Sequence, residues 1–304
     1  MITDLKKLEQ TLHLNLDFSA IMDMFAEFPL KVPESFVQRM RQNDINDPLL
    51  QQILPNSNEL KETPGFGQDP LGGSQHSPIA GLIHKYHGRV LLLVTSECAV
   101  NCRFCFRRHQ RPKISDWGKV FSYIKNDITV SEVILSGGDP LMLQPDELTN
   151  IMAELGAILH IKRIRIHSRV PLVLPERITS ELIRSSIPVI LMVHCNHPQE
   201  INVKVQHAFD LLQQQSDAIF NQSVLLRGIN DNSAVLIELC EKLFAAGVVP
   251  CYLHLLDKVQ GAAHFALDFE HAVKIYREMK EKLPGYLVPK LVMETQNRKQ
   301  YVYI

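Results

Sequence analysis

The feature that most constrains the fold of this chain is a regular alternation of short apolar runs with helix-like segments. Six runs have the length and composition of buried β-strands: 89–95, 132–136, 163–168, 189–193, 218–224 and 249–255. Six helix-like segments alternate with them: about 115–127, 145–159, 175–186, 199–215, 231–246 and 267–282. Strands that alternate with helices indicate a parallel sheet, and right-handed crossovers would curl that sheet. The sequence therefore predicts an α/β fold, a partial parallel (βα)6 barrel.

The predicted barrel occupies residues 81–283, and the segments on either side of it differ in character. Residues 1–80 are expected to form an N-terminal extension of short helices and loops. Apolar residues at mixed helical spacing over 12–28 and a helix start at Pro33 indicate this. Residues 284–304 are expected to form a separate C-terminal segment.

Composition excludes several classes of protein. The 304 residues carry 32 Lys and Arg against 33 Asp and Glu, a net charge of -1, so no basic face for nucleic acid is expected. No apolar run reaches membrane-spanning length and no signal peptide is recognised. We therefore expect a cytoplasmic protein without a membrane partner, in which the six cysteines stay reduced. Self-association is compatible with the N-terminal extension.

Three cysteines stand close together as Cys98-x3-Cys102-x2-Cys105. Three thiolates can hold a soft metal or three irons of an iron–sulfur cube. Zinc sites usually have paired ligands, and electron-transfer clusters use a fourth cysteine, which is not nearby here. A cube held by three thiolates keeps one iron open, as catalysis requires. A structural zinc in a non-catalytic module, or thiols buried in a loop, remain alternative interpretations.

Chemically active side chains follow the predicted strands at the point where each one ends. They occupy positions 98–108, 137–139, 168–169, 194–197, 222–223 and 257–258. In parallel α/β folds ligands bind at the carboxyl ends of the strands, so these residues are expected to meet. Two of them, Gly137 and Gly138, would let the backbone approach a ligand closely. The guanidinium of Arg107 suits a carboxylate, and the carboxylate of Asp257 suits an ammonium group.

The cysteine motif resembles the signature of radical S-adenosylmethionine enzymes. A more specific resemblance, to the lysine 2,3-aminomutase family, runs from about Val32 almost to the end of the chain. It rests on the segments 98–109, 135–141, 166–175, 194–200, 221–231 and 285–289. The stretches 257–265 and 285–291 resemble the branch of that family that serves β-lysylation of elongation factor P. The resemblance implies a partial barrel of the radical S-adenosylmethionine type.

The resemblance implies an isomerase that converts L-α-lysine to β-lysine, with the R isomer expected, for modification of elongation factor P. It implies a [4Fe-4S] cluster, S-adenosyl-L-methionine and pyridoxal 5'-phosphate as cofactors. It also implies an external electron donor and a functional link to elongation factor P and its lysyl ligase. The alternative is a catabolic 2,3-aminomutase that acts on lysine or on another amino acid, such as glutamate.

The resemblance also assigns residues to the cluster, to S-adenosylmethionine and to the substrate. The cluster ligands would be Cys98, Cys102 and Cys105. The S-adenosylmethionine motif would be Gly137, Gly138 and Asp139. The substrate carboxylate would bind Arg107, and the substrate ε-ammonium would bind Asp257 with Glu294 as a second carboxylate.

A lysine near the C-terminus would carry pyridoxal phosphate. Lys299 matches the family position best, with Lys290 as the alternative, although Glu294 to Arg298 replaces the family's glycine-rich lead-in. Arg89 and Lys85 match basic residues near the cofactor phosphate. Gln222, at the end of a predicted strand, is also expected to contact a cofactor.

Overall fold

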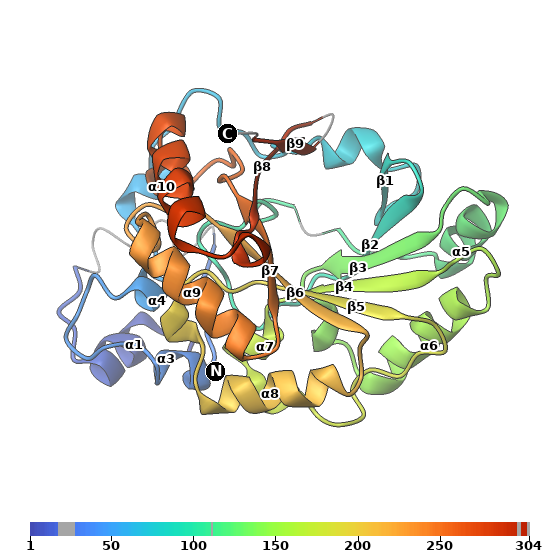
Figure 1. The fold of residues 1–304 in the computed structure, drawn as a ribbon, viewed down its shortest axis with the longest axis horizontal. Helices are drawn as coiled ribbons and strands as arrows, with labels where there is room; N and C mark the ends of the chain where they lie inside the picture. The colour runs from blue at the N-terminus through green and yellow to red at the C-terminus, as the bar shows by residue number, and fades with distance from the viewer. Residues whose placement is uncertain (18–27, 111, 297–298, 303–304) are drawn as a thin grey trace.

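The computed structural model describes residues 1–17, 28–110, 112–296 and 299–302. Within these residues nine strands form one sheet, in the order in which they occur in the chain (Figure 1). The strands are β1 (Leu82–Tyr86), β2 (Arg89–Thr95), β3 (Glu132–Gly137), β4 (Arg163–Ser168), β5 (Val189–Val193), β6 (Ala218–Val224), β7 (Val249–His254), β8 (Lys290–Glu294) and β9 (Lys299–Tyr301). Strands β2 to β8 run parallel. At the two edges β1 and β9 pair antiparallel, so the sheet is open.

The longer helices pack around the outside of this curved sheet (Figure 1). They are α5 (Trp117–Asn126), α6 (Pro145–Gly156), α8 (Val203–Gln213), α9 (Ser233–Ala245) and α10 (Phe269–Lys282). Four of them start where an Asp or Asn side chain accepts a hydrogen bond from a backbone amide of the first turn: Asp116, Asn202, Asn232 and Asp268. Helix α6 starts instead at Pro145, whose missing amide costs nothing at that position.

The predicted barrel is confirmed in its central strands and corrected in its connections. The six predicted strands correspond to β2 through β7, while β1 and the two C-terminal strands are additions to the six. The predicted helix over 175–186 is wrong: only α7 (Val170–Val173) and the 3-10 turn η5 (Pro175–Arg177) form between β4 and β5. Ile178, Leu182 and Ile183 are spaced as they would be on one face of a helix. They belong instead to an irregular loop, and their side chains are buried. Apolar spacing reports burial, and here burial does not require a helix.

The first 80 residues contain short helices that pack onto the barrel. These are α1 (Leu5–Leu12), α3 (Glu34–Val37), α4 (Pro48–Gln51) and the 3-10 turns η2 (Ser57–Leu60) and η3 (Gly73–His76). Helix α1 ends because His13 adopts a left-handed conformation, with φ of 52°. Most of the predicted helical stretch over 12–28 falls on residues 18–27, outside the described residues.

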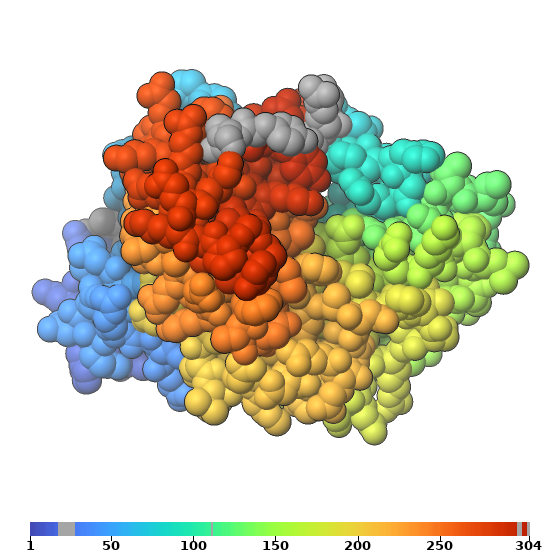
Figure 2. All heavy atoms as spheres, viewed as in Figure 1, coloured from blue at the N-terminus to red at the C-terminus, as the bar shows by residue number. Residues whose placement is uncertain are grey.

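One hydrophobic core connects the N-terminal segment to the sheet. Buried residues from the first helices, such as Leu8, Phe36 and Leu50, belong to the same cluster as Leu92 and Leu191 of the strands. Figure 2 accordingly shows the N-terminal residues (blue) in contact with the body of the molecule, at one end of it. A second core packs α9 and α10 against β7 and β8. No helix in the described part of the chain has both the length and the apolar character to span a bilayer.

Candidate active site

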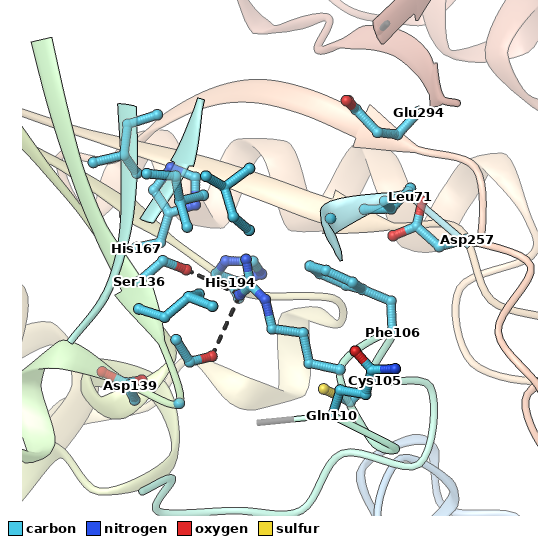
Figure 3. Close-up of a pocket in the computed structure, with 18 of the residues that line it drawn as sticks. Leu71, Cys105, Phe106, Gln110, Ser136, Asp139, His167, His194, Asp257 and Glu294 are labelled. Atoms are coloured by element: carbon cyan, nitrogen blue, oxygen red, sulfur yellow. Dashed lines mark hydrogen bonds between the residues drawn. The ribbon is translucent and has the colours of Figure 1, made fainter. Parts of the chain in front are cut away.

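One cavity of about 790 Å³ is lined by residues from each of the six segments that the sequence placed after the ends of the strands (Figure 3). Apart from the alternative lysine Lys290, its lining includes every predicted site residue whose side chain the structure describes: Lys85, Arg89, Cys98, Cys102, Cys105, Arg107, Gly137, Gly138, Asp139, Gln222, Asp257 and Glu294. The backbone of Lys299 lies in β9, opposite Glu294 of β8. The side chain of Lys299 is outside the described part of the chain.

The two glycines at the end of β3, Gly137 and Gly138, allow the cysteine loop to start close to the sheet. The amide of Gly138 donates to the Thr95 carbonyl at 2.6 Å, and that of Asp139 donates to the Glu97 carbonyl at 2.7 Å. A Cβ atom on Gly138 would lie 2.0 Å from the Glu97 carbonyl oxygen. Gly137 has φ of +119°, and a Cβ there would lie 2.5 Å from the Thr95 carbonyl oxygen. Only glycine fits at these two positions.

The three cysteines of the loop lie at the wall of this cavity and are partly buried thiols. Burial raises the pKa of the Cys102 thiol, and the nearby Arg169 acts in the opposite direction. In the described residues no three His, Cys, Asp or Glu side chains converge to hold a single metal ion. In a cube the three thiolates would bind three different irons and leave the fourth open, so they need not converge on one ion, and the donor set fits that cluster.

Arg169, directly after β4, is a residue of the site to which the sequence assigned no role. Its Nη1 atom donates to Cys102 Sγ at 2.8 Å. Its Nη2 atom donates to Gln52 Oε1 at 2.6 Å and to Glu200 Oε2 at 3.0 Å. Burial lowers the pKa of Arg169, but Cys102 and Glu200 outweigh it and the net shift is upward. The signals in the sequence were the position of 168–169 after a strand and the family resemblance of the segment 166–175.

The carboxylate of Asp139 is occupied by hydrogen bonds within the protein. One oxygen accepts from Ser168 Oγ at 2.7 Å and from the Leu141 amide at 3.1 Å. The other accepts from the Arg169 and Val170 amides at 2.6 and 3.0 Å. Asp139 therefore ties the end of β3 to the end of β4.

Arg107 and Asp257 bring opposite charges to the same cavity. The Nη1 atom of Arg107 donates to Ser136 Oγ at 3.0 Å and to the Gly137 carbonyl at 3.3 Å. Burial lowers the pKa of Arg107, whereas Cys105, Cys98 and Asp257 raise it. In Figure 3 the Asp257 carboxylate lies beside Leu71, across from the phenyl ring of Phe106. The cavity can thus receive a molecule with a carboxylate at one point and a cation at another.

Glu294 forms an ion pair inside the cavity, which the sequence did not predict. Its Oε1 atom lies 3.2 Å from Lys85 Nζ and also accepts a hydrogen bond from the Tyr86 hydroxyl. The side chains of Lys85 and Glu294 are 8% and 12% exposed. Arg89 stacks on the Tyr86 ring at 4.6 Å. Lys290, by contrast, is exposed at the start of β8 and does not line the cavity.

A neutral histidine, His194, also lines the cavity, next to Gln222. The Nε2 atom of Gln222 is hydrogen-bonded to His194 Nε2 and lies 3.4 Å from His167 Nδ1. Burial, together with the positive charges of Arg169 and Arg107, lowers the pKa of His194 to about 3. At neutral pH His194 therefore offers an uncharged imidazole.

Comparison with known proteins gives relatives that cover nearly the whole chain. No family model matches the sequence. The L-lysine 2,3-aminomutase of Escherichia coli is 44% identical over 97% of this chain and 89% of its own length. The L-lysine 2,3-aminomutase of Buchnera aphidicola is 44% identical over 100% of this chain and 92% of its own length. The enzyme of the same name from Clostridium subterminale is 39% identical, over 83% of this chain and 63% of its own length.

Solved structures resemble the chain only distantly. A radical SAM methyltransferase from Sphaerobacter thermophilus has a TM-score of 0.49 at 16% identity and covers 72% of each chain. The close sequence relatives, by contrast, match over nearly the full length, and their identity is high enough to define common descent. The chain therefore belongs to the L-lysine 2,3-aminomutase family.

Proposed function

We propose that the protein is an L-lysine 2,3-aminomutase, which moves the α-amino group of L-lysine to the neighbouring carbon and releases β-lysine. The observation that carries the proposal is that Arg107 and Asp257 share one cavity with three cysteine thiols. The curated relatives that bear this enzyme name support it.

The residues of the cavity fit the cofactors that this reaction needs. Cys98, Cys102 and Cys105 would each hold one iron of a [4Fe-4S] cluster, and the backbone at 137–139 would contact S-adenosylmethionine. When bound, the cluster with S-adenosylmethionine supplies a carbon radical, and pyridoxal phosphate supplies a conjugated ring that delocalises the unpaired electron.

The protein's own contribution is to hold the substrate at both ends. The guanidinium of Arg107 would bind the α-carboxylate, and the carboxylate of Asp257 would bind the ε-ammonium group. A substrate without a distal cation, such as glutamate, would place no positive charge beside Asp257. This arrangement favours lysine over an acidic amino acid. Glu294 is paired with Lys85, so it would have to give up this ion pair to bind the substrate ε-ammonium as a second carboxylate.

We place pyridoxal phosphate on Lys299, with its phosphate near Arg89 and Lys85 and with Gln222 beside a cofactor. The exposed position of Lys290, outside the cavity, supports this choice over Lys290. Borohydride reduction of the loaded protein, followed by peptide mass spectrometry, tests it. The adduct is expected on Lys299, and an adduct on Lys290 or Lys85 would contradict the assignment.

We further propose that the product serves the modification of elongation factor P through a separate lysyl ligase, with electrons from an external donor. The support is the resemblance of the stretches 257–265 and 285–291 to that branch of the family. The expected product is the R isomer.

One assay tests the activity and its handedness. Anaerobic protein with a reconstituted cluster is incubated with L-lysine, S-adenosylmethionine, pyridoxal phosphate and dithionite, and the products are separated by chiral chromatography. We expect (R)-β-lysine. The S isomer would favour a catabolic aminomutase. If iron-loaded protein forms no β-lysine, the proposal is wrong.

A further inference from the structure

The buried carboxylate of Glu59 binds two arginines of the cysteine loop at once. Arg103 donates to it from Nε at 2.8 Å and from Nη2 at 2.5 Å. Arg108 donates to Glu59 Oε2 from Nη2 at 2.5 Å. The exposed fractions of the three side chains are 1% for Glu59, 0% for Arg103 and 4% for Arg108. Two positive charges that lie almost out of water thus depend on one negative charge from η2.

Arg108 extends this contact to the loop that follows β7. Its Nη1 atom donates to the Gly261 carbonyl at 3.1 Å and to the Arg103 carbonyl at 2.9 Å. Gly261 has φ of +87°, and a Cβ atom there would lie 2.9 Å from the Arg108 guanidinium carbon. The arginine therefore packs against backbone that only glycine provides.

The same loop is tied to the N-terminal segment at two more points. The Gly67 amide donates to the Lys258 carbonyl at 3.0 Å, and the Gln260 amide donates to the Gly67 carbonyl at 2.9 Å. From the cysteine loop, the Nε2 atom of His109 lies 3.0 Å from the carbonyl oxygen of Gln260. Asp257 lies near the start of this loop, so the backbone that follows its carboxylate is held by the N-terminal segment and by the cysteine loop.

We propose that Glu59 and Arg108 are positioning residues that fix Asp257 relative to the cysteine loop. The inference rests on the proposed function, because Asp257 is there the group that binds the ε-ammonium of lysine. Neither Glu59 nor Arg108 lines the cavity, so neither touches the substrate. They act through Gly261: the charge of Glu59 keeps the Arg108 guanidinium inside, and the guanidinium holds the loop.

The experiment compares Glu59→Gln and Arg108→Gln with the unchanged holoprotein. Glu59→Gln removes the shared charge, and Arg108→Gln cuts the contact with Gly261 while the Glu59–Arg103 pair remains. Glu132→Gln is the matched control, since Glu132 also pairs with two arginines, Arg163 and Arg165, but at the amino ends of β3 and β4. Two measurements are made: hydrogen–deuterium exchange of peptides over 257–265, and the KM for L-lysine beside the KM for S-adenosylmethionine.

We expect exchange over 257–265 to accelerate at least ~5-fold in both variants and to stay unchanged in Glu132→Gln. The KM for L-lysine should rise about tenfold, with the iron content and the KM for S-adenosylmethionine within about twofold. Unchanged exchange over 257–265 in folded Arg108→Gln overturns the inference, even if Glu59→Gln does not fold. The exchange measurement needs no turnover. If the unchanged protein forms no β-lysine, the proposed function is refuted. The hydrogen–deuterium exchange measurement would still test the positioning role.

Discussion

The guanidinium of Arg169 donates a hydrogen bond to Cys102 Sγ at 2.8 Å. Its other terminal nitrogen lies 3.0 Å from the buried carboxylate of Glu200. The middle cysteine of the loop is thus joined through one arginine to the η6 turn (Pro198–Glu200) after β5. Positive charge beside sulfur favours the thiolate, which is the form that binds metal.

Replacing Glu200 by Gln is expected to destabilise the protein strongly. Glu200 is 0% exposed and pairs with Arg169, so its loss leaves a buried guanidinium without its anionic partner. Breaking such a pair costs about 3–5 kcal/mol of the free energy of unfolding. Urea unfolding measures this loss. The control Glu181→Gln removes an exposed pair with Arg184 and should cost no more than about 1 kcal/mol.

Single replacement of Cys98, Cys102 or Cys105 by Ala is expected to abolish iron binding. A cube with only two protein thiolates is held poorly, so the charge-transfer absorbance of the reconstituted cluster should disappear. Cys251→Ala is the control, because Cys251 does not line the cavity. Retention of a full complement of iron by all three variants would contradict the assignment.

Gly138→Ala is expected to disrupt the cysteine loop. The new Cβ would meet the Glu97 carbonyl oxygen at 2.0 Å, and that atom belongs to the backbone, so the loop has to move. Reconstitution of the variant should yield less than about a tenth of the iron of the unchanged protein. Gly285→Ala provides the comparison, because no atom lies within 4 Å of the corresponding Cβ.

Asp257→Asn is expected to weaken the binding of lysine. Loss of a charged hydrogen bond costs about 1.5–3 kcal/mol, which corresponds to a rise of about 10- to 150-fold in KM. Steady-state assays over a range of L-lysine concentrations check this. Asp268→Asn, at the exposed start of α10, should retain the KM, since Asn caps a helix as well as Asp. An unchanged KM in Asp257→Asn would place the ε-ammonium elsewhere.

The low pKa of His194 predicts a specific sensitivity to acid. The pKa is about 3 in the folded protein and about 6.5 in an unfolded chain, so the unfolded state binds more protons between these values. The contribution of His194 to stability is complete above about pH 6.5 and is lost as the pH falls, at up to about 1.4 kcal/mol per pH unit.

The variant His194→Gln isolates this effect. From about pH 6.5 to 5 the unchanged protein should lose about 1–2 kcal/mol more stability than the variant, measured by urea unfolding at each pH. Equal losses would show that His194 is protonated in the folded protein within this range.

Local patterns in the sequence were sufficient for the central strands and for the cysteine loop. Strands β2 to β7 are apolar runs whose neighbours in the sheet are also their neighbours along the chain. The helix predicted over 175–186 does not form, because the apolar residues of this segment pack against parts of the chain that are distant in sequence. Ile178 and Leu182 are spaced as on a helix, but they are buried in the main hydrophobic core without forming one. Strand β1 was missed because its residues Leu82–Tyr86 include two polar side chains and alternate weakly.

The sequence by itself determined the parallel α/β fold, the cysteine spacing and the gathering of polar groups at the carboxyl ends of the strands, because each depends on periodicity or on residues close in the chain. Only the tertiary structure decided which charges meet. Glu59 reaches Arg103 across 44 positions, and Arg169 reaches Gln52 across 117. A charged or polar group that is buried away from water needs a partner, and only the folded backbone determines which group lies beside it.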